Sequence, residues 1–297
     1  MRIIFLVMTL CVLFNNIAVA DDHKVAVRAY QGIEYAISHW GPTVKLLEKK
    51  IPGHTFTLVP IVSLKEVIVR AGNNEFDFVI TNPSSFVEIE QLFGARPLAT
   101  LNNRRADTAQ DRFGSVIFTH VKNNDILKIK DLEGKSLMVV SERAFGGWQV
   151  AWLEMLEQGF NPQKLLKNLM FTKSNTQPEV VQAVLDGKAD AGVVRTDLLE
   201  RMEAAGKVDM RYLRIINNKD IKGFPFFIST KLYPEWAFAA MNSVPVELSQ
   251  QVKKILFAVD PDSEAARKGQ YVGWLPPRDY STVRALLKTL KIQPGLQ

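Results

Sequence analysis

Two stretches of the chain share one design: GNNEFDFVIT at residues 72–81 and GKADAGVVRT at residues 187–196. Each has a glycine that ends a helix, then an aspartate, an apolar run and a polar residue at its tip. Such an apolar run predicts a buried parallel strand, and the polar tip then lies at the carboxyl end, where open α/β sheets bind ligands. The two copies therefore predict two lobes, each with its own ligand edge. A single sheet with two similar βα units is the alternative.

Strands and helices alternate around both stretches. The sequence predicts the order β-α-β-α-β-α over residues 24–93 and a second βαβαβ set over residues 114–194, as in doubly wound α/β domains. A strand at Phe224–Ser229 would return the chain to the first lobe. Two lobes whose ligand edges face each other across a cleft are typical of periplasmic binding proteins. The expected division is residues 21–115 plus 226–297 for lobe 1 and residues 116–225 for lobe 2.

The N-terminus has the pattern of a secretory signal peptide. Arg2 precedes an apolar run at residues 3–14, and Ala18-Val19-Ala20 precedes two aspartates, which predicts cleavage after Ala20 and export to the periplasm. A membrane anchor is the alternative, but the run is shorter than the roughly 20 residues that span a bilayer. Cys11, the only cysteine, lies in this segment. A lipidated cysteine is usually preceded by a small residue, which Cys11 lacks, and this argues against the alternative of a lipoprotein. The mature chain would then have no thiol and no disulfide.

Composition excludes several classes of function. A hydrophobic share of 47% is ordinary for a globular protein, and the net charge of +6 comes from basic residues dispersed along the chain, which argues against nucleic acid as a partner. The four histidines are scattered, and neither a His-Glu-x-x-His nor a Gly-x-Ser-x-Gly motif occurs, so we expect no metal, no cofactor and no enzyme. Glu88 and Glu90 are interpreted as solvated charge on a helix face.

Two predicted helix starts have the chemistry of anion sites. The segment SERAFGGWQ at residues 141–149 enters a helix through Gly146 and Gly147, where backbone N–H groups can bind an anion that glycines let approach closely. It lacks the Gly-Lys-Ser/Thr ending of a nucleotide-binding loop, and a plain strand-to-helix turn is the alternative. Thr81 and Asn82 bring polar side chains to the other helix start.

Arginine supplies the second candidate chemistry. Arg195 directly follows a predicted buried strand, where a guanidinium could clamp an oxyanion through paired hydrogen bonds. Its alternative is an ion pair with Glu142 or Asp197. We predict that Arg195→Ala weakens anion binding at least tenfold and leaves the protein folded. Arg104 and Arg105 could act in the same way, although one of two adjacent arginines usually faces solvent.

Aromatic side chains near predicted strand ends are candidate walls of the cleft. Since most aromatic residues are core residues, we expect about half of them to be structural. They are Tyr30, Phe113, Phe145, Trp148 and Phe224.

The motifs taken together resemble one family, and the resemblance covers almost the whole chain after residue 20. They are TNPSSFVEIE, LNNRR, FGSVIF, SERAFGGWQVAW, VLDGKADAGVVRT, GFPFFIST followed by KLYPEW, and GQYVGWLPPRDY. The chain is similar to the phosphate/phosphonate-binding-like (PhnD-type) periplasmic proteins, and especially to the sensor domain of tetrathionate-sensing histidine kinases. This resemblance implies a type II periplasmic binding protein fold with two crossing hinge strands. It also implies closure over a small oxyanion that contacts Tyr30, Thr81, Asn82, Ser141, Phe145–Gly147 and Arg195.

The resemblance also shapes the expected function. The serine- and threonine-rich helix start of phosphonate binders is here Phe145-Gly146-Gly147, which leaves sulfur oxyanions open beside phosphonates. We expect a monomeric periplasmic solute-binding protein that delivers its anion to an ABC-type permease. The alternative is a stand-alone sensor that presents its ligand-bound state to a membrane histidine kinase, a separate partner because the sequence ends at Gln297 without a kinase. An enzyme on the same fold is a third hypothesis.

Overall fold

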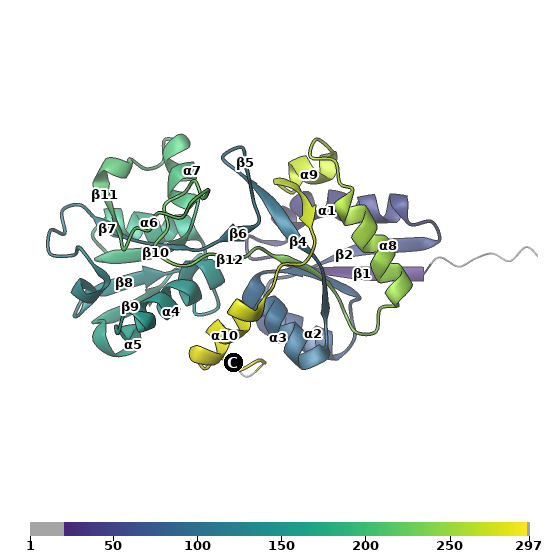
Figure 1. Cartoon of the computed structure of the whole chain (residues 1–297), viewed down its shortest axis with the longest axis horizontal. Coiled ribbons are helices and arrows are strands. Elements are labelled where there is room, and N and C mark those ends of the chain that lie inside the picture. The colour runs from purple at the N-terminus through teal and green to yellow at the C-terminus, as the bar shows by residue number, and fades with distance from the viewer. Residues whose placement is uncertain (1–20, 296–297) are drawn as a thin grey trace, which may run out of the picture.

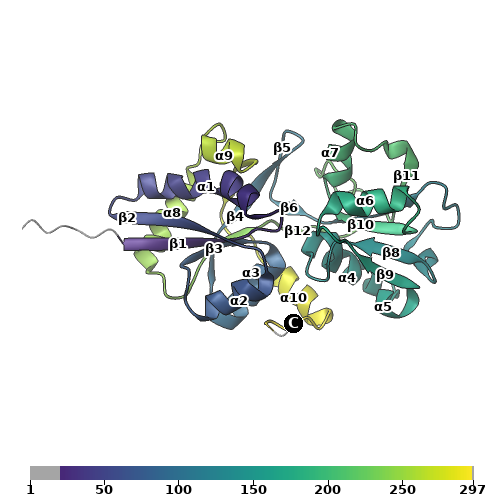
Figure 2. The same cartoon turned by 180° about the vertical axis from the view of Figure 1, so that it is seen from behind.

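The computed structural model describes residues 21–295, and its strands form two lobes side by side (Figures 1 and 2). The expected signal peptide and Cys11 lie outside the described residues. Two crossing strands, β6 (Arg112–Phe113) and β12 (Tyr233–Pro234), pair antiparallel between the lobes. This two-lobed α/β architecture with a paired-strand hinge matches the fold class predicted from the sequence.

Lobe 1 is built on a seven-stranded sheet of order β14-β4-β13-β3-β1-β2, with β5 paired to β4. The strands β1, β2 and β3 are parallel, whereas β13, β4 and β14 add antiparallel strands. The strands are β1 Asp21–Arg28, β2 His54–Ile61, β3 Phe78–Thr81, β4 Arg96–Arg105, β5 Thr108–Gln110, β13 Ala237–Ala240 and β14 Tyr271–Leu275. The helices are α1 Ile33–Lys50, α2 Leu64–Gly72, α3 Pro83–Phe93, α8 Val246–Phe257, α9 Glu264–Lys268 and α10 Ser281–Thr289.

Lobe 2 is built on a five-stranded sheet of order β11-β7-β10-β8-β9. Its strands are β7 Ser115–His120, β8 Ser136–Val139, β9 Asn168–Phe171, β10 Ala191–Arg195 and β11 Leu213–Ile216. Its helices are α4 Val150–Glu157, α5 Pro162–Leu165, α6 Gln177–Leu185 and α7 Leu198–Ala204, with short 3-10 turns at Ile129–Leu132 and Met210–Tyr212 and a π-helical turn at Phe145–Gln149.

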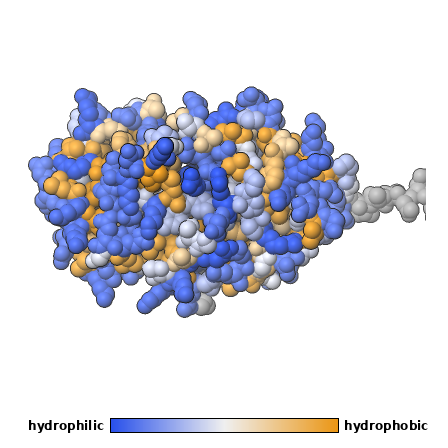
Figure 3. All heavy atoms as spheres, viewed as in Figure 1, coloured by the Kyte–Doolittle hydropathy of each residue, from blue (hydrophilic) through white to orange (hydrophobic). Residues whose placement is uncertain are grey.

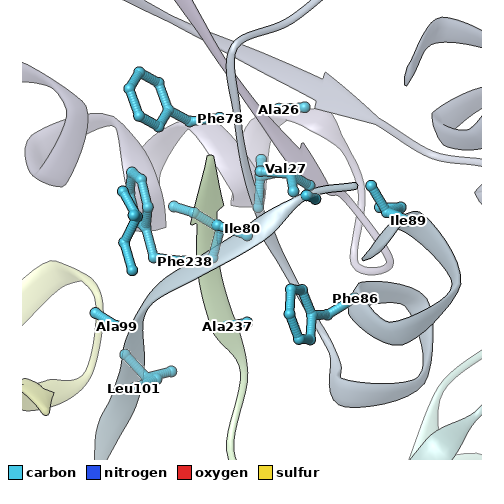
Figure 4. Close-up of a cluster of buried hydrophobic side chains, with 14 of the residues drawn as sticks. Ala26, Val27, Phe78, Ile80, Phe86, Ile89, Ala99, Leu101, Ala237 and Phe238 are labelled. Carbon is cyan, nitrogen blue, oxygen red and sulfur yellow. The ribbon is translucent and has the colours of Figure 1, made fainter. Parts of the chain in front are cut away.

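The two sequence stretches that share one design form β3 and β10, each buried almost along its whole length. Strand β3 pairs parallel with β1, and β10 pairs parallel with β8. Figure 4 shows how Phe78 and Ile80 of β3 pack with Phe238 of β13, while Phe86 of α3 packs in the same core. This packing fixes the start of α3 at the end of β3, at the edge that faces lobe 2.

The strand expected at Phe224–Ser229 does not form. Pro225 lacks a backbone N–H for a sheet ladder, and the end of the segment is tied instead to lobe 2. The backbone N–H of Ser229 donates to the Ser115 carbonyl at 2.8 Å, and the Ser229 hydroxyl donates to the Ile216 carbonyl at 2.7 Å. The chain therefore crosses back at β12.

The surface seen in Figure 3 intersperses hydrophilic and hydrophobic side chains over both lobes. Within residues 21–295, no helix combines the length and the apolar character needed to cross a bilayer.

Candidate functional site

The facing edges of the lobes carry polar side chains, as expected for carboxyl ends of strands. Arg28 ends β1 and Thr81 ends β3 in lobe 1, whereas Arg195 ends β10 in lobe 2. Charged side chains from the two lobes are in direct contact here. The candidate site is therefore this interlobe region, bounded on one side by the hinge strands.

The start of α3 combines a helix N-terminus with buried hydroxyls. Asn82 caps the helix, since its Oδ1 accepts from the Ser85 backbone N–H at 3.1 Å. The hydroxyls of Thr81 and Ser84 are buried and have no hydrogen-bond partner within the described part of the chain. Because the first backbone N–H groups of a helix also need acceptors, this start can bind an anion.

The second predicted helix start is closely packed. Phe145–Gln149 forms a π-helical turn before α4, and the Gly146 carbonyl accepts from the Ser115 hydroxyl at 2.7 Å. A Cβ added at Gly146 would lie 2.7 Å from the Phe113 ring, and one at Gly147 would lie 2.8 Å from Val140. Contact with neighbouring protein atoms thus explains both glycines without a ligand. Ser141, just before this turn, is half-buried.

The predicted aromatic walls divide between the interlobe region and the cores. Phe145 is buried and packs edge-on against Phe113 and Tyr233, one from each hinge strand. Tyr30 is 40% exposed and lies 5.6 Å, centroid to centroid, from Trp236.

The other two aromatic candidates make contacts within lobe 2 or the segment that leaves it. Trp148 is 1% exposed and stacks on Trp152 in a core of lobe 2. Phe224 packs edge-on against Phe226, between β11 and β12. Trp148 thus belongs to a core of lobe 2, whereas the described ring contact of Phe224 is with its own segment.

A charged group, here called the hinge cluster, consists of Arg105, Arg195, Asp197 and Glu235. Arg195 forms an ion pair with Glu235, and its Nε lies 3.4 Å from Asp197 Oδ1. Arg105 Nε lies 3.4 Å from Asp197 Oδ2. Because Arg105 and Glu235 belong to lobe 1 and the other two to lobe 2, two ion pairs of the cluster join the lobes. The alternative of an Arg195–Asp197 ion pair is thus observed.

The electrostatics of the hinge cluster are those of buried, paired charges. Burial acts to lower the pKa of Arg195, but the carboxylates of Glu235 and Asp197 outweigh it and raise that pKa above its usual value. Burial and the nearby Arg195 lower the pKa of Arg105. The guanidinium of Arg195 also stacks over the Phe113 ring, with Cζ 4.1 Å from the ring centroid. Arg195 is therefore held at the hinge on three sides.

Only one of the two adjacent arginines joins the hinge cluster. Successive residues of a strand point to opposite faces, so Arg105 reaches Asp197 while Arg104 donates from Nη2 to the Pro261 carbonyl at 2.7 Å. Arg104 thus holds the loop before α9.

A third interlobe ion pair was missed by sequence reasoning. Glu88 of α3 is fully buried and bonds to Arg143 of lobe 2 at 2.7 Å, so its interpretation as solvated charge is wrong. Burial raises the pKa of Glu88, and Arg143 opposes that rise. Glu90 is also paired, with Arg284 of α10 at 2.6 Å. Helical periodicity identifies the face of α3 that carries Glu88 but not the lobe that covers it.

Metal ligation finds no support in the described residues. Between residues 21 and 295, no three or more His, Asp, Glu or Cys side chains are grouped so that they could hold a metal ion.

Comparison with known proteins places this geometry in context. The family model described as the periplasmic substrate-binding protein of phosphonate ABC transporters matches residues 29–281. The tetrathionate sensor histidine kinase TtrS of Salmonella typhimurium is 30% identical over 283 residues, covering 93% of this chain and 45% of TtrS. This chain therefore spans less than half the length of that relative.

Solved structures share the fold at low sequence identity. PhnD1 from Prochlorococcus marinus in complex with methylphosphonate has a TM-score of 0.68 at 14% identity, over 92% of this chain and 99% of PhnD1. XAC2383 from Xanthomonas citri bound to ATP has a TM-score of 0.69 at 14% identity, over 90% of this chain and 95% of XAC2383. The aliphatic sulphonate binding protein SsuA from Escherichia coli has a TM-score of 0.54 at 13% identity, over 93% and 80% of the two chains. At these identities the likeness shows the type II periplasmic binding protein fold alone.

Proposed function

The chain belongs to the family of periplasmic substrate-binding proteins of phosphonate ABC transporters, and we propose that it closes over a small oxyanion and delivers it to an ABC-type permease. The family is one of non-catalytic, substrate-binding proteins. The proposed ligand is a sulfur oxyanion or a phosphonate-like anion.

The start of α3 is the observation that carries this proposal. Two buried hydroxyls, of Thr81 and Ser84, have no partner among the described residues and lie at the N-terminus of an eleven-residue helix. An oxyanion would supply the missing acceptors for these hydroxyls and for the free backbone N–H groups. We propose that Tyr30, Asn82 and Ser141 lie around the same ligand.

Relatives of this chain support the class of ligand. TtrS is named for tetrathionate, and the compared structures include a methylphosphonate complex and an aliphatic sulphonate binding protein. These ligands share a terminal group of three oxygens on sulfur or phosphorus. A helix start with hydroxyl donors suits that shared group whichever central atom carries it.

A thermal-shift screen tests the proposal. The purified protein is heated with phosphate, methylphosphonate, sulfate, thiosulfate or tetrathionate, and a ligand bound only by the native state raises the melting temperature. We expect a selective shift with one class of anion, reduced in Thr81→Val and unchanged in Thr289→Val, whose hydroxyl lies on α10. No shift with any anion would contradict the proposal.

A stand-alone sensor is the second candidate, favoured by the TtrS match over 93% of this chain. A strain that lacks the protein separates the two roles. Loss of anion uptake would support transport, whereas intact uptake with loss of anion-induced gene expression would support sensing through a histidine kinase.

Export and assembly are also proposals. Mass spectrometry of the periplasmic protein should find Asp21 at its N-terminus if cleavage follows Ala20. Light scattering should find a monomer.

A further inference from the structure

Arg195 is the residue that sequence reasoning assigns to an oxyanion, yet a carboxylate of the other lobe holds it. Arg195 ends β10 in lobe 2, and both of its Nη atoms face Glu235, which directly follows the hinge strand β12. Nη1 donates to Glu235 Oε2 at 3.5 Å, and Nη2 donates to Oε1 over a shorter distance. The internal carboxylate thus occupies the donors that a bound oxyanion would use.

Glu235 is fixed in place by lobe 1 independently of Arg195. Its side chain is fully buried. Asn103 Nδ2 donates to Oε1 at 2.6 Å, the backbone N–H of Trp236 donates to Oε2 at 3.1 Å, and the Tyr280 hydroxyl donates to the Glu235 carbonyl at 2.9 Å. Because all three donors belong to lobe 1, the carboxylate keeps its position when the lobes separate.

Asp197 pairs with Arg105 and Arg195, and also with the partly exposed Arg201, whereas Arg195 is the one cation that the described residues pair with Glu235. An anion that took Arg195 would leave the buried carboxylate of Glu235 without its cation. An uncompensated buried charge is strongly unfavourable. An anion that binds Arg195 only weakly therefore gains no net affinity by displacing Glu235.

We infer that Glu235 is a specificity-determining residue, which holds Arg195 back from the ligand and so lowers the affinity of the interlobe site for small anions. This inference rests on the proposed function and adds a carboxylate that selects against weakly bound anions. Removal of the carboxylate frees a guanidinium whose planar fork matches an oxyanion.

Calorimetric titration with sulfate tests the inference on the wild type, Glu235→Gln and Glu90→Gln. We expect Glu235→Gln to bind sulfate at least tenfold more tightly than the wild type. Glu90→Gln is the matched control, because Glu90 pairs with Arg284 away from the hinge cluster, and its affinity should stay within twofold of the wild type. Equal or weaker binding by Glu235→Gln would overturn the inference.

A further substitution distinguishes a freed guanidinium from a general effect of charge. Lysine keeps the positive charge but lacks the fork of donors. Arg195→Lys combined with Glu235→Gln should therefore bind sulfate within threefold of the wild type. If the tenfold gain persists in this variant, charge alone explains it and the inference is wrong.

The inference stays testable if Glu235→Gln fails to fold, as circular dichroism would show. Arg195→Gln with Glu235→Gln removes both charges and keeps the hydrogen-bonding shapes. Because the wild-type ligand does not use Arg195 under this inference, the double variant should bind the screened anion as the wild type does. A tenfold loss would overturn the inference.

Failure of the inference and failure of the proposed function give different results. If the wild type binds an oxyanion and Glu235→Gln binds no anion more tightly, the function stands and the inference falls. If the wild type binds none of the screened anions but Glu235→Gln binds sulfate, the inference stands and the function falls. If neither binds, both are overturned.

Discussion

At the scale of single residues, Arg195 links stability to binding. Its guanidinium is buried against Glu235 and Asp197. Asp197 also pairs with Arg105 and Arg201, so Arg195→Ala leaves Glu235 as the buried carboxylate without a cation. Breaking a buried pair in this way costs about 3–5 kcal/mol. We expect urea unfolding to show a loss of about that size, and calorimetry to show at least tenfold weaker anion binding because Glu235 is left uncompensated.

Arg201 provides the control for Arg195. It shares Asp197 as a partner at 2.6 Å, but its side chain is 44% exposed. Exposed pairs contribute about 0–1 kcal/mol, so Arg201→Ala should unfold within about 1 kcal/mol of the wild type. If Arg195→Ala is as stable as the wild type, the buried ion pairs do not stabilise the fold, and the prediction from the sequence, that this variant weakens binding alone, holds.

His39 of α1 gives a second prediction at this scale. Burial, with Arg105 nearby, lowers its pKa to about 4, below the usual value near 6.5. The His39 ring of the unfolded chain therefore binds a proton more readily than that of the folded protein. The contribution of His39 to stability is fully present above pH 6.5 and is lost as the pH falls towards 4. The free energy of unfolding should drop by up to about 1.4 kcal/mol per pH unit in this window.

Nuclear magnetic resonance of the His39 ring checks this pKa directly. Urea unfolding of the wild type and of His39→Gln, compared between pH 6.5 and pH 5, isolates its contribution from that of the carboxylates. A parallel pH dependence in the two proteins would rule out the predicted contribution of His39.

The candidate residues show what a sequence can and cannot predict about a site. Thr81, Asn82 and Arg195 became candidates because a polar residue after a buried run marks a strand end, and the structure places them at the ends of β3 and β10 and at the start of α3. Glu235 and Arg143 were missed, since their partners Arg195 and Glu88 lie 40 and 55 positions away. Pairing over such distances depends on how the lobes meet, which local patterns do not encode.

At the scale of elements, the π-helical turn after β8 depends on close contact with the hinge. A Cβ at Gly146 would lie 2.7 Å from the Phe113 ring of β6, and overpacking of this kind typically costs about 1–3 kcal/mol. We expect Gly146→Ala to lower the melting temperature and, by displacing Phe113, to weaken anion binding.

Gly41 is the matched control for this substitution. It lies inside α1, and a Cβ there meets no atom of the described residues within 4 Å, apart from its chain neighbours and the backbone of its own helix. Because Pro42 follows directly and disfavours helical backbone for a residue with a Cβ, the helix-propensity gain of alanine over glycine is offset, and Gly41→Ala should melt close to the wild type. Equal melting temperatures for the two variants would contradict the packing account of Gly146.

Local patterns predicted the parallel strands better than the antiparallel ones. The buried runs of β3 and β10 are continuous, so their apolar composition identified them. The strands that complete the lobe 1 sheet, β13 and β14, arrive from the end of the chain and pair with β4. That pairing depends on where the chain returns to lobe 1 through the hinge. The return was predicted too early, near residue 225, because the aromatic residues around Pro225 resemble a strand.

At the scale of the whole molecule, buried ion pairs join the two lobes both at the hinge cluster and at the middle of helix α3. Arg195–Glu235 and Arg105–Asp197 lie near the hinge, and Arg143–Glu88 joins lobe 2 to α3. Helix α10 of lobe 1 also contacts α4 of lobe 2 (Figure 1). Buried pairs are screened far less than exposed ones, so moderate salt should leave the contact between the lobes intact.

Glu88→Gln tests whether these pairs bias closure. The substitution keeps the shape of the side chain but removes the charge that holds Arg143, and Arg143, 19% exposed, can turn towards water. The ligand-free population should shift towards separated lobes, seen as a larger radius of gyration in small-angle X-ray scattering. Under the proposed closure over an anion, only the closed form contacts the anion with both lobes, so affinity should fall about threefold to tenfold, and saturating anion should restore the wild-type radius. Glu90→Gln, on the same helix, should change neither quantity, and an unchanged radius and affinity in Glu88→Gln would show that the lobes close without help from this pair.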